Sequence, residues 1–193
     1  MDTSNDAAPG PAPVWFRYLA KACSRSKRHP VARYAQLATV DADGAPRCRT
    51  VVVRGLVEAP RGVWFVTDAR SGKAEELARE PRVELCWYFA GLREQYRLRG
   101  RVEELDEAAR EDAWARLSPS SRGTFLWPPP GTPRTDDDMF PPETRGTTPV
   151  PCFRALRLVA DAVDFLSLRD APHERVRWTR DATGEWNDVR VRP

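Results

Sequence analysis

Short stretches in which apolar and polar residues alternate recur along most of this chain, separated by turn sequences. Asp41-Ala42-Asp43-Gly44 is typical of a tight hairpin turn, which joins antiparallel strands. Helical spacing is confined to a few segments, so the alternation of strands and helices that builds a parallel sheet is missing. The pattern predicts a mainly β fold, an antiparallel barrel with a few short helices. The expected strands are residues 34–40, 46–55, 62–67, 82–89, 93–105, 153–168, 175–180 and 185–191.

Three segments have the spacing of amphipathic helices: residues 14–24, 72–79 and 106–117. In the first, Trp15, Leu19 and Ala22 fall on one face. In the third, Asp106 is the expected N-cap.

The chain is long enough for one domain with a substantial core, which we expect to span residues 14–193. Residues 1–13 are small, polar and proline-rich, and we expect them to be disordered. Residues 119–151 contain half of the 18 prolines and are expected to form one long loop without regular structure. A loop of this length inside a domain is either disordered or functional.

Composition excludes several classes of function. The 31 basic and 28 acidic residues are mixed along the chain and leave a net charge of +3, so no nucleic-acid-binding stripe is expected. No apolar run is long enough for a membrane span or a signal peptide, and we expect a cytoplasmic protein. The 4 cysteines and 2 histidines have no ligand spacing, so no metal site is expected.

Cationic residues lie at both ends of one predicted strand and at the start of the helix that follows the next predicted strand. Arg49 and Arg54 bracket a β-branched run, while Ser71 and Lys73 lie where the helix of residues 72–79 begins. Free N–H groups and the dipole at a helix start favour a phosphate. These residues therefore indicate a phosphate pocket. The alternative is that the arginines only solvate a strand and that Ser71-Gly72-Lys73 is an ordinary capped turn.

A resemblance favours the phosphate pocket. The motifs are Arg-Thr-Val-Val-x-Arg at residues 49–54, Phe-Val-Thr-Asp at 65–68, Arg-Ser-x-Lys at 70–73 and Arg-Glu-Gln-Tyr-Arg-Leu at 93–98. In this order they resemble the pyridoxamine 5′-phosphate oxidase-like flavoproteins, in particular a branch with a Trp-Pro-x-Pro-Gly loop. The likeness runs from about Trp15 to Pro193. It implies an FMN-binding split β-barrel, and a homodimer with FMN at the interface.

The resemblance also implies which residues bind FMN. Arg49 would contact the phosphate or ribityl chain, and Lys73 the phosphate. Gly72 departs from the usual arginine, so Arg70 or Ser71 would have to compensate. A loop from the second subunit would supply Gly131 and Thr132. The full set of expected FMN-binding residues is Arg49, Thr50, Val51, Val52, Arg54, Val66, Thr67, Ser71, Lys73, Gln95, Gly131, Thr132 and Arg175.

The expected substrate pocket departs further from the family pattern. Ala171 stands where an arginine binds the substrate in the true oxidases, and Ser118 replaces a second arginine. Arg122 replaces a serine, so a cation could have moved. For His173 the alternative is a turn histidine bonded to the backbone. The expected substrate residues are Arg54, Trp114, Ser118, Arg122 and His173.

The expected function is oxidation of a small substrate, such as a phosphorylated amine, by hydride transfer to FMN with oxygen as the acceptor. Two alternatives remain. One is an FMN- or deazaflavin-dependent reductase that acts on another small molecule, which the loss of the arginine at position 171 favours. The other is a flavin-binding module without catalytic activity.

Overall fold

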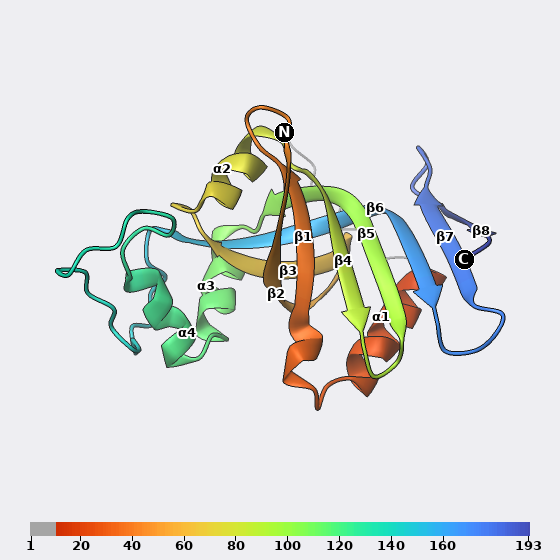
Figure 1. The fold of residues 1–193 in the computed structure, drawn as a ribbon, viewed down its shortest axis with the longest axis horizontal. Coiled ribbons are helices and arrows are strands. Elements are labelled where there is room, and N and C mark those ends of the chain that lie inside the picture. The colour runs from red at the N-terminus through yellow and green to blue at the C-terminus, as the bar shows by residue number, and fades with distance from the viewer. Residues whose placement is uncertain (1–10) are drawn as a thin grey trace.

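The computed structural model describes residues 11–193, so most of the predicted disordered tail lies outside the described residues. Eight antiparallel strands form one sheet in the order β3-β2-β1-β4-β5-β6-β7-β8, and β3 also pairs with β6. That extra pairing closes β1 to β6 into a barrel, with β7 and β8 extending beyond it (Figure 1). The strands are β1 Tyr34–Val40, β2 Pro46–Glu58, β3 Arg61–Asp68, β4 Arg82–Phe89, β5 Glu94–Glu104, β6 Phe153–Ser167, β7 Glu174–Arg180 and β8 Trp186–Arg190. The prediction of an antiparallel barrel is confirmed.

Strand β6 closes the barrel because it pairs with three other strands. Its first half pairs with β3, its second half pairs with β7, and β5 runs along most of its length. Gly62 and Gly100 lie where neighbouring strands come closest to β6. An added Cβ would lie 1.8 Å from the Leu158 carbonyl oxygen at Gly62 and 1.9 Å from the Val159 oxygen at Gly100. Only glycine permits this approach.

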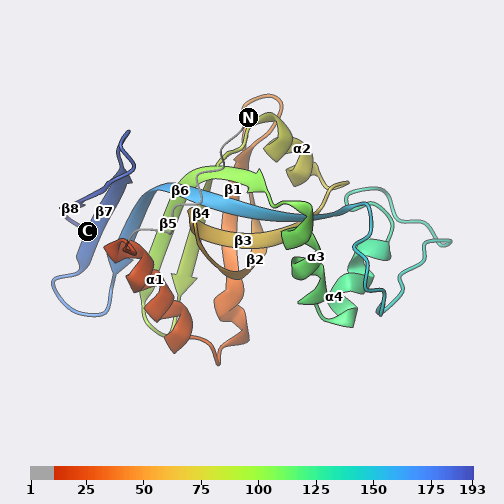
Figure 2. The same cartoon turned by 180° about the vertical axis from the view of Figure 1, so that it is seen from behind.

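Among the described residues, four α-helices and two short 3₁₀ helices lie outside the barrel: α1 Val14–Arg25, η1 Pro30–Arg33, α2 Gly72–Arg79, α3 Glu107–Ala115, α4 Pro119–Gly123 and η2 Thr124–Leu126. Helix α1 lies at one end of the molecule, near β7, and α3 and α4 lie at the opposite end (Figure 2). Trp15, Leu19 and Ala22 of α1 are buried, as predicted. Asp106 accepts a hydrogen bond from the Ala109 N–H and caps α3, also as predicted.

Two hydrophobic clusters hold these elements together. The larger one fills the barrel and includes α1, and the smaller one joins α3, η2 and the start of β6 through Trp114, Phe125 and Phe153. Each buried side chain of this size stabilises the fold by about 1.5–3 kcal/mol. Trp87 and Phe89 of β4 also belong to the larger core.

The prediction that residues 119–151 lack regular structure is wrong at their start, where α4 and η2 form. Ser118 caps α4 by accepting a hydrogen bond from the Ser121 N–H, and Pro119 occupies the first turn, where its missing N–H costs nothing. No helix or strand occupies residues 127–151.

Candidate functional site

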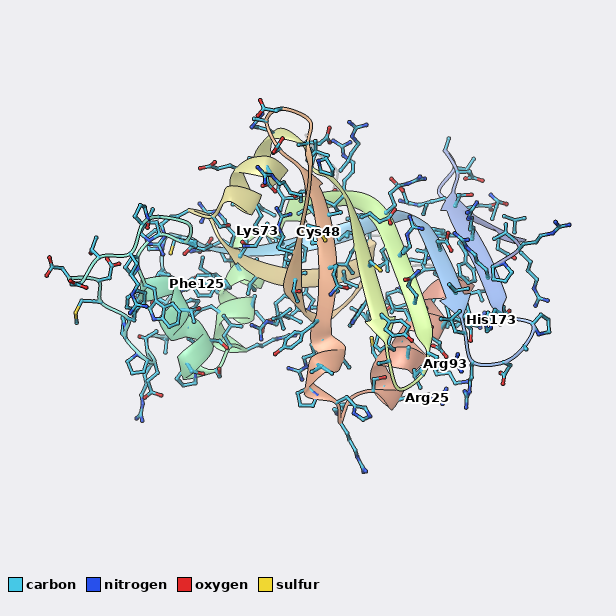
Figure 3. All side chains as sticks on the ribbon, viewed as in Figure 1. Arg25, Cys48, Lys73, Arg93, Phe125 and His173 are labelled. Atoms are coloured by element: carbon cyan, nitrogen blue, oxygen red, sulfur yellow. The ribbon has the colours of Figure 1, made fainter. Side chains whose placement is uncertain are left out.

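A cleft of about 610 Å³ lies where the end of β3 and the start of α2 face the proline-rich loop. It brings together six of the predicted FMN residues: Arg54, Val66, Thr67, Lys73, Gly131 and Thr132. The loop also contributes aromatic and charged residues that were not predicted as site residues: Phe125, Trp127, Arg134, Asp138 and Phe140. Figure 3 places Lys73 and Phe125 on the same side of the molecule. The aromatic residues of the loop are the sequence signal that could have identified this wall of the cleft, since aromatic side chains in a loop usually pack against another surface.

The start of α2 has the character of an anion site. Ser71 is the N-cap residue, yet no side chain caps the helix, so N–H groups of the first turn remain available. The Ser71 hydroxyl instead donates to the Asp68 carbonyl oxygen at 2.7 Å and lies 3.3 Å from Thr67 Oγ1. Lys73 Nζ donates to Ser71 Oγ at 3.2 Å. The hydroxyls of Thr67 and Ser71 and the ammonium group of Lys73 therefore converge at the helix start.

Lys73 is a cation without a carboxylate partner in the part of the chain that the structure describes. Burial lowers its pKa below the ordinary value, and the nearby charge of Arg49 lowers it further, while Asp68 and Glu76 act in the opposite direction. A partly buried ammonium group with a lowered pKa is stabilised when an anion binds beside it.

Arg54 is the second free cation of the cleft. Its Nε is buried and has no hydrogen-bond partner among the described residues. Burial, followed by the charge of Arg33, lowers its pKa. An orphaned buried N–H costs free energy unless a ligand accepts from it. Arg54, Lys73 and the hydroxyls beside it fit the anionic and polar groups of a flavin nucleotide.

Two other predicted cations are neutralised by the protein itself. Arg49 Nη2 lies 2.6 Å from Glu76 Oε2, and its Nη1 donates to Thr39 Oγ1. Arg70 forms an ion pair of 2.7 Å with Asp68 and donates to the carbonyl oxygens of Phe125 and Trp127. Arg70 therefore attaches the base of the loop to β3. The prediction that it could replace the arginine missing at position 72 is not supported by this geometry.

The remaining predicted residues of β2 lie beside the cleft but do not line it. Val51 faces the barrel interior and is 5% exposed, whereas Val52 is half-buried and Thr50 is exposed. For Val51 only backbone groups are left to contact a ligand, as the resemblance implied for the two valines.

Gln95 and Arg175 are not brought to the cleft within one chain. They lie in one row across the sheet, because Gln95 pairs with Leu166 and Leu166 pairs with Arg175. Arg175 makes two hydrogen bonds to Asp164, of 3.0 and 2.8 Å, and Gln95 Oε1 accepts from Cys86 Sγ at 3.6 Å. Gly131 and Thr132, in contrast, are brought to the cleft. The resemblance implies that they reach the flavin from a second subunit, and within one chain they line the cleft beside Lys73.

The predicted substrate residues are mostly used for structure. Trp114 is fully buried, and its Nε1 donates to the Gly146 carbonyl oxygen. Arg122 donates to the carbonyl oxygens of Trp114, Ala115 and Gly146 at 2.9–3.1 Å. Ser118 caps α4. None of these three lines the cleft, so the prediction that Arg122 is a free, relocated cation is wrong for this conformation.

His173 lies near one end of the molecule, well away from Lys73 (Figure 3). Its Nδ1 lies 2.9 Å from the Asp170 carbonyl oxygen, so it forms the turn contact that was its alternative interpretation. No group of three or more histidine, cysteine or carboxylate residues in residues 11–193 is arranged to hold a metal ion. Over the same residues, no helix is long and apolar enough to cross a membrane.

A closed antiparallel barrel, with cations that lack a carboxylate partner in a cleft at the start of a short helix, is the arrangement expected of the split-barrel flavoproteins. The family model described as pyridoxamine 5′-phosphate oxidase, FMN-binding domain, matches residues 12–106. This chain belongs to that family, and it is an FMN-binding oxidoreductase of the pyridoxamine 5′-phosphate oxidase type.

Curated relatives match nearly the whole chain. The chain is 34% identical to pyridoxine/pyridoxamine 5′-phosphate oxidase 2 of Arabidopsis thaliana, over 93% of this chain and 96% of the relative. It is 31% identical to pyridoxine/pyridoxamine 5′-phosphate oxidase of Burkholderia orbicola, over 97% of this chain and 91% of the relative.

Solved structures show the same fold. A pyridoxamine 5′-phosphate oxidase-related, FMN-binding protein from Nostoc punctiforme superimposes with a TM-score of 0.88 and 36% identity, covering 95% of this chain and all of that one (100%). PhzG from Burkholderia lata superimposes with a TM-score of 0.73 over 97% of this chain and 95% of its own, but at 22% identity it supports the fold alone.

Proposed function

We propose that this protein binds FMN in the cleft at the start of α2 and oxidises a small phosphate-bearing amine or alcohol, of the kind for which its relatives are named. The observation that carries the proposal is the convergence of the unpaired cations Lys73 and Arg54 with Thr67 in one cleft of a member of this family. Bound FMN supplies the hydride acceptor, and oxygen is the proposed final acceptor of electrons.

The residues of the cleft have separate proposed roles. Lys73, the Thr67 hydroxyl and the first N–H groups of α2 bind the FMN phosphate. Arg54, with its buried Nε, donates to the flavin or to the substrate beside it. The loop residues Trp127 to Thr132 cover the site and exclude water, which strengthens the polar contacts inside.

We further propose that the active form is a homodimer. Gln95 and Arg175 resemble flavin-binding residues of the family, yet they lie in a row on β5 and β7 rather than in the cleft. A second copy that presents this row would bring both residues to the flavin. The four cysteines are free thiols, which suits a reducing compartment, and we propose that the protein acts in the cytoplasm.

A second candidate keeps the flavin but changes the substrate. Position 171 is alanine, and Arg122 is bound to three carbonyl oxygens, so two expected phosphate-binding cations are missing from the substrate side. These observations favour a reductase or oxidase that acts on another small molecule, with FMN or a deazaflavin as cofactor.

The test is to add FMN to the purified protein, remove the excess and record the flavin absorbance, then to measure peroxide released from pyridoxamine phosphate and pyridoxine phosphate. Flavin uptake with peroxide release supports the oxidase. Flavin uptake without turnover of either substrate favours the second candidate, and a colourless protein contradicts both.

A further inference from the structure

The phosphate end of the cleft has too few cations if Lys73 acts alone. A phosphate monoester carries about −1.5 to −2 charges at pH 7. The resemblance implies an arginine next to this lysine, and this chain has Gly72 there. A Cβ added at Gly72 would meet nothing within 4 Å, so the space beside the helix start is open.

The arginines nearest in sequence do not replace this cation. Arg70 is held by Asp68 and by two carbonyl oxygens at the base of the loop. Arg49 is held by Glu76. Withdrawing either guanidinium would leave a partly buried carboxylate unpaired, which is costly.

Of the described residues, two arginines line the cleft, Arg54 and Arg134, and Arg54 is already assigned to the flavin or the substrate, so Arg134 is the remaining candidate. It lines the same cleft as Lys73 and Thr132, and the residues that the structure describes give it no ion pair. Its guanidinium lies 4.7 Å from the centre of the Phe140 ring, which holds it by a cation–π contact and leaves its N–H groups unused. The acidic loop residue of the cleft, Asp138, instead accepts from the Thr135 N–H at 2.9 Å and from the Thr135 hydroxyl at 3.1 Å.

We propose that Arg134 is the second cation of the FMN phosphate site and takes the place of the arginine missing at position 72. The inference rests on the proposed function, since it assumes that FMN occupies this cleft. It also gives the proline-rich loop a specific role: the loop brings a phosphate-binding arginine to the cofactor from the side opposite α2.

The experiment compares the dissociation constants of FMN and of riboflavin, which lacks the phosphate, by quenching of flavin fluorescence. Arg134→Ala should weaken FMN binding at least about tenfold and riboflavin binding less than about twofold, because a charged hydrogen bond to the phosphate is lost. Arg134→Lys should retain part of the FMN affinity. The matched control is Arg145→Ala in the same loop, whose side chain is 90% exposed and does not line the cleft. It should change neither constant.

A rescue variant tests whether Arg134 replaces position 72. In the Arg134→Ala background, Gly72→Arg should recover most of the FMN affinity and leave the riboflavin affinity unchanged, since the space beside Gly72 is open. Lys73→Ala serves as the reference for the cleft. If Lys73→Ala weakens FMN selectively but Arg134→Ala does not, the inference about Arg134 is wrong while the proposed site stands. If neither variant distinguishes FMN from riboflavin, the phosphate does not bind in this cleft and both fail.

Discussion

Arg49 of β2 and Glu76 of α2 form an ion pair of 2.6 Å that joins the barrel wall to the helix that begins at the cleft. Glu76 Oε2 also accepts a hydrogen bond from the Thr39 hydroxyl of β1. Leu77 is the one buried residue of α2, so apolar packing contributes little to the position of this helix. The polar contacts of Glu76 therefore set where the helix start, and Lys73 with it, lies relative to β3.

Glu76→Ala should lower the free energy of unfolding by about 1–2 kcal/mol, because it removes the carboxylate that both Arg49 and the Thr39 hydroxyl contact in a partly exposed site. Denaturant unfolding measures the change. Glu75→Ala removes an exposed carboxylate from the same helix and should cost only a few tenths of a kcal/mol. Equal losses in the two variants would mean that the Arg49–Glu76 pair does not position α2.

Lys73→Ala should weaken FMN binding by about 1.5–3 kcal/mol, the range for hydrogen bonds to charged groups. Riboflavin should lose much less, because it has no phosphate for Lys73 to bind. Flavin fluorescence titration of the wild-type protein and the variant gives both constants. Equal losses for the two ligands would assign Lys73 to another part of the flavin or to the fold.

The pH dependence of FMN binding follows from the lowered pKa of Lys73, which burial and then Arg49 cause. FMN binds the protonated lysine, so its affinity should fall as the pH rises through that lowered pKa. The phosphate loses its second proton near pH 6, so affinity should rise from about pH 5 to 7. Without ligand, the unfolded chain holds the Lys73 proton more tightly than the folded chain, so this group's contribution to stability increases with pH over the same alkaline range.

Lys73→Arg separates the titration of the lysine from that of the phosphate, because arginine stays charged over the whole pH range. The alkaline fall in FMN affinity should disappear in this variant and the acidic rise should remain. Titrations of FMN at constant ionic strength between pH 5 and 10 measure both limbs. An alkaline fall that persists in the variant would show that another group titrates there.

The sequence predicted the positions of the strands better than the pairing that closes them into a barrel. Alternation and turn residues are local signals, and they placed all eight strands within a few residues, although β2 extends to Glu58 rather than ending at position 55. The pairing of β3 with β6 joins segments far apart in the chain, and no local pattern specifies it. The start of α4 could have been found, since Ser118-Pro119 is a known helix-start sequence.

For the site, the sequence shows which residues are cations, but not which of them are left without a partner in the protein and can bind a ligand. The motifs predict that Lys73 and Thr67 share one pocket, and both line the cleft, because they belong to one short strand-to-helix segment. Whether an arginine is free depends on distant partners: Glu76 for Arg49, and three backbone carbonyls for Arg122. Arg134 was missed because it lies in a loop with no periodic pattern.

Ala171→Arg tests whether the substrate pocket lost a phosphate-binding cation. If the proposed dimer brings this turn to the flavin, the variant should raise kcat/KM for pyridoxamine phosphate about tenfold, mainly through KM. Ala182→Arg adds the same charge to the exposed turn between β7 and β8 and should have no effect. A gain in both variants would indicate general electrostatic attraction rather than a restored contact.

Arg122→Ala should affect stability rather than substrate binding. The guanidinium donates to the carbonyl oxygens of Trp114 and Ala115 at the end of α3, and to that of Gly146 in the loop. Its removal deletes three hydrogen bonds and the contact with the Trp114 ring, and we expect a loss of about 2 kcal/mol in the free energy of unfolding. Below the unfolding transition, FMN affinity and the KM for a phosphorylated substrate should stay within about twofold of wild type, since no contact in the cleft is lost.

The control for this variant is Arg116→Ala, which removes an exposed arginine paired with Asp112 on the same helix and should cost under about 1 kcal/mol. Arg122→Lys should recover little of the stability, because one ammonium group cannot donate to three separate carbonyls in the geometry of a guanidinium. Denaturant midpoints and steady-state kinetics on the same preparations separate the two roles. An unchanged midpoint together with a raised KM for phosphorylated substrates alone would make Arg122 a substrate ligand, and would mean that its carbonyl contacts give way when substrate binds.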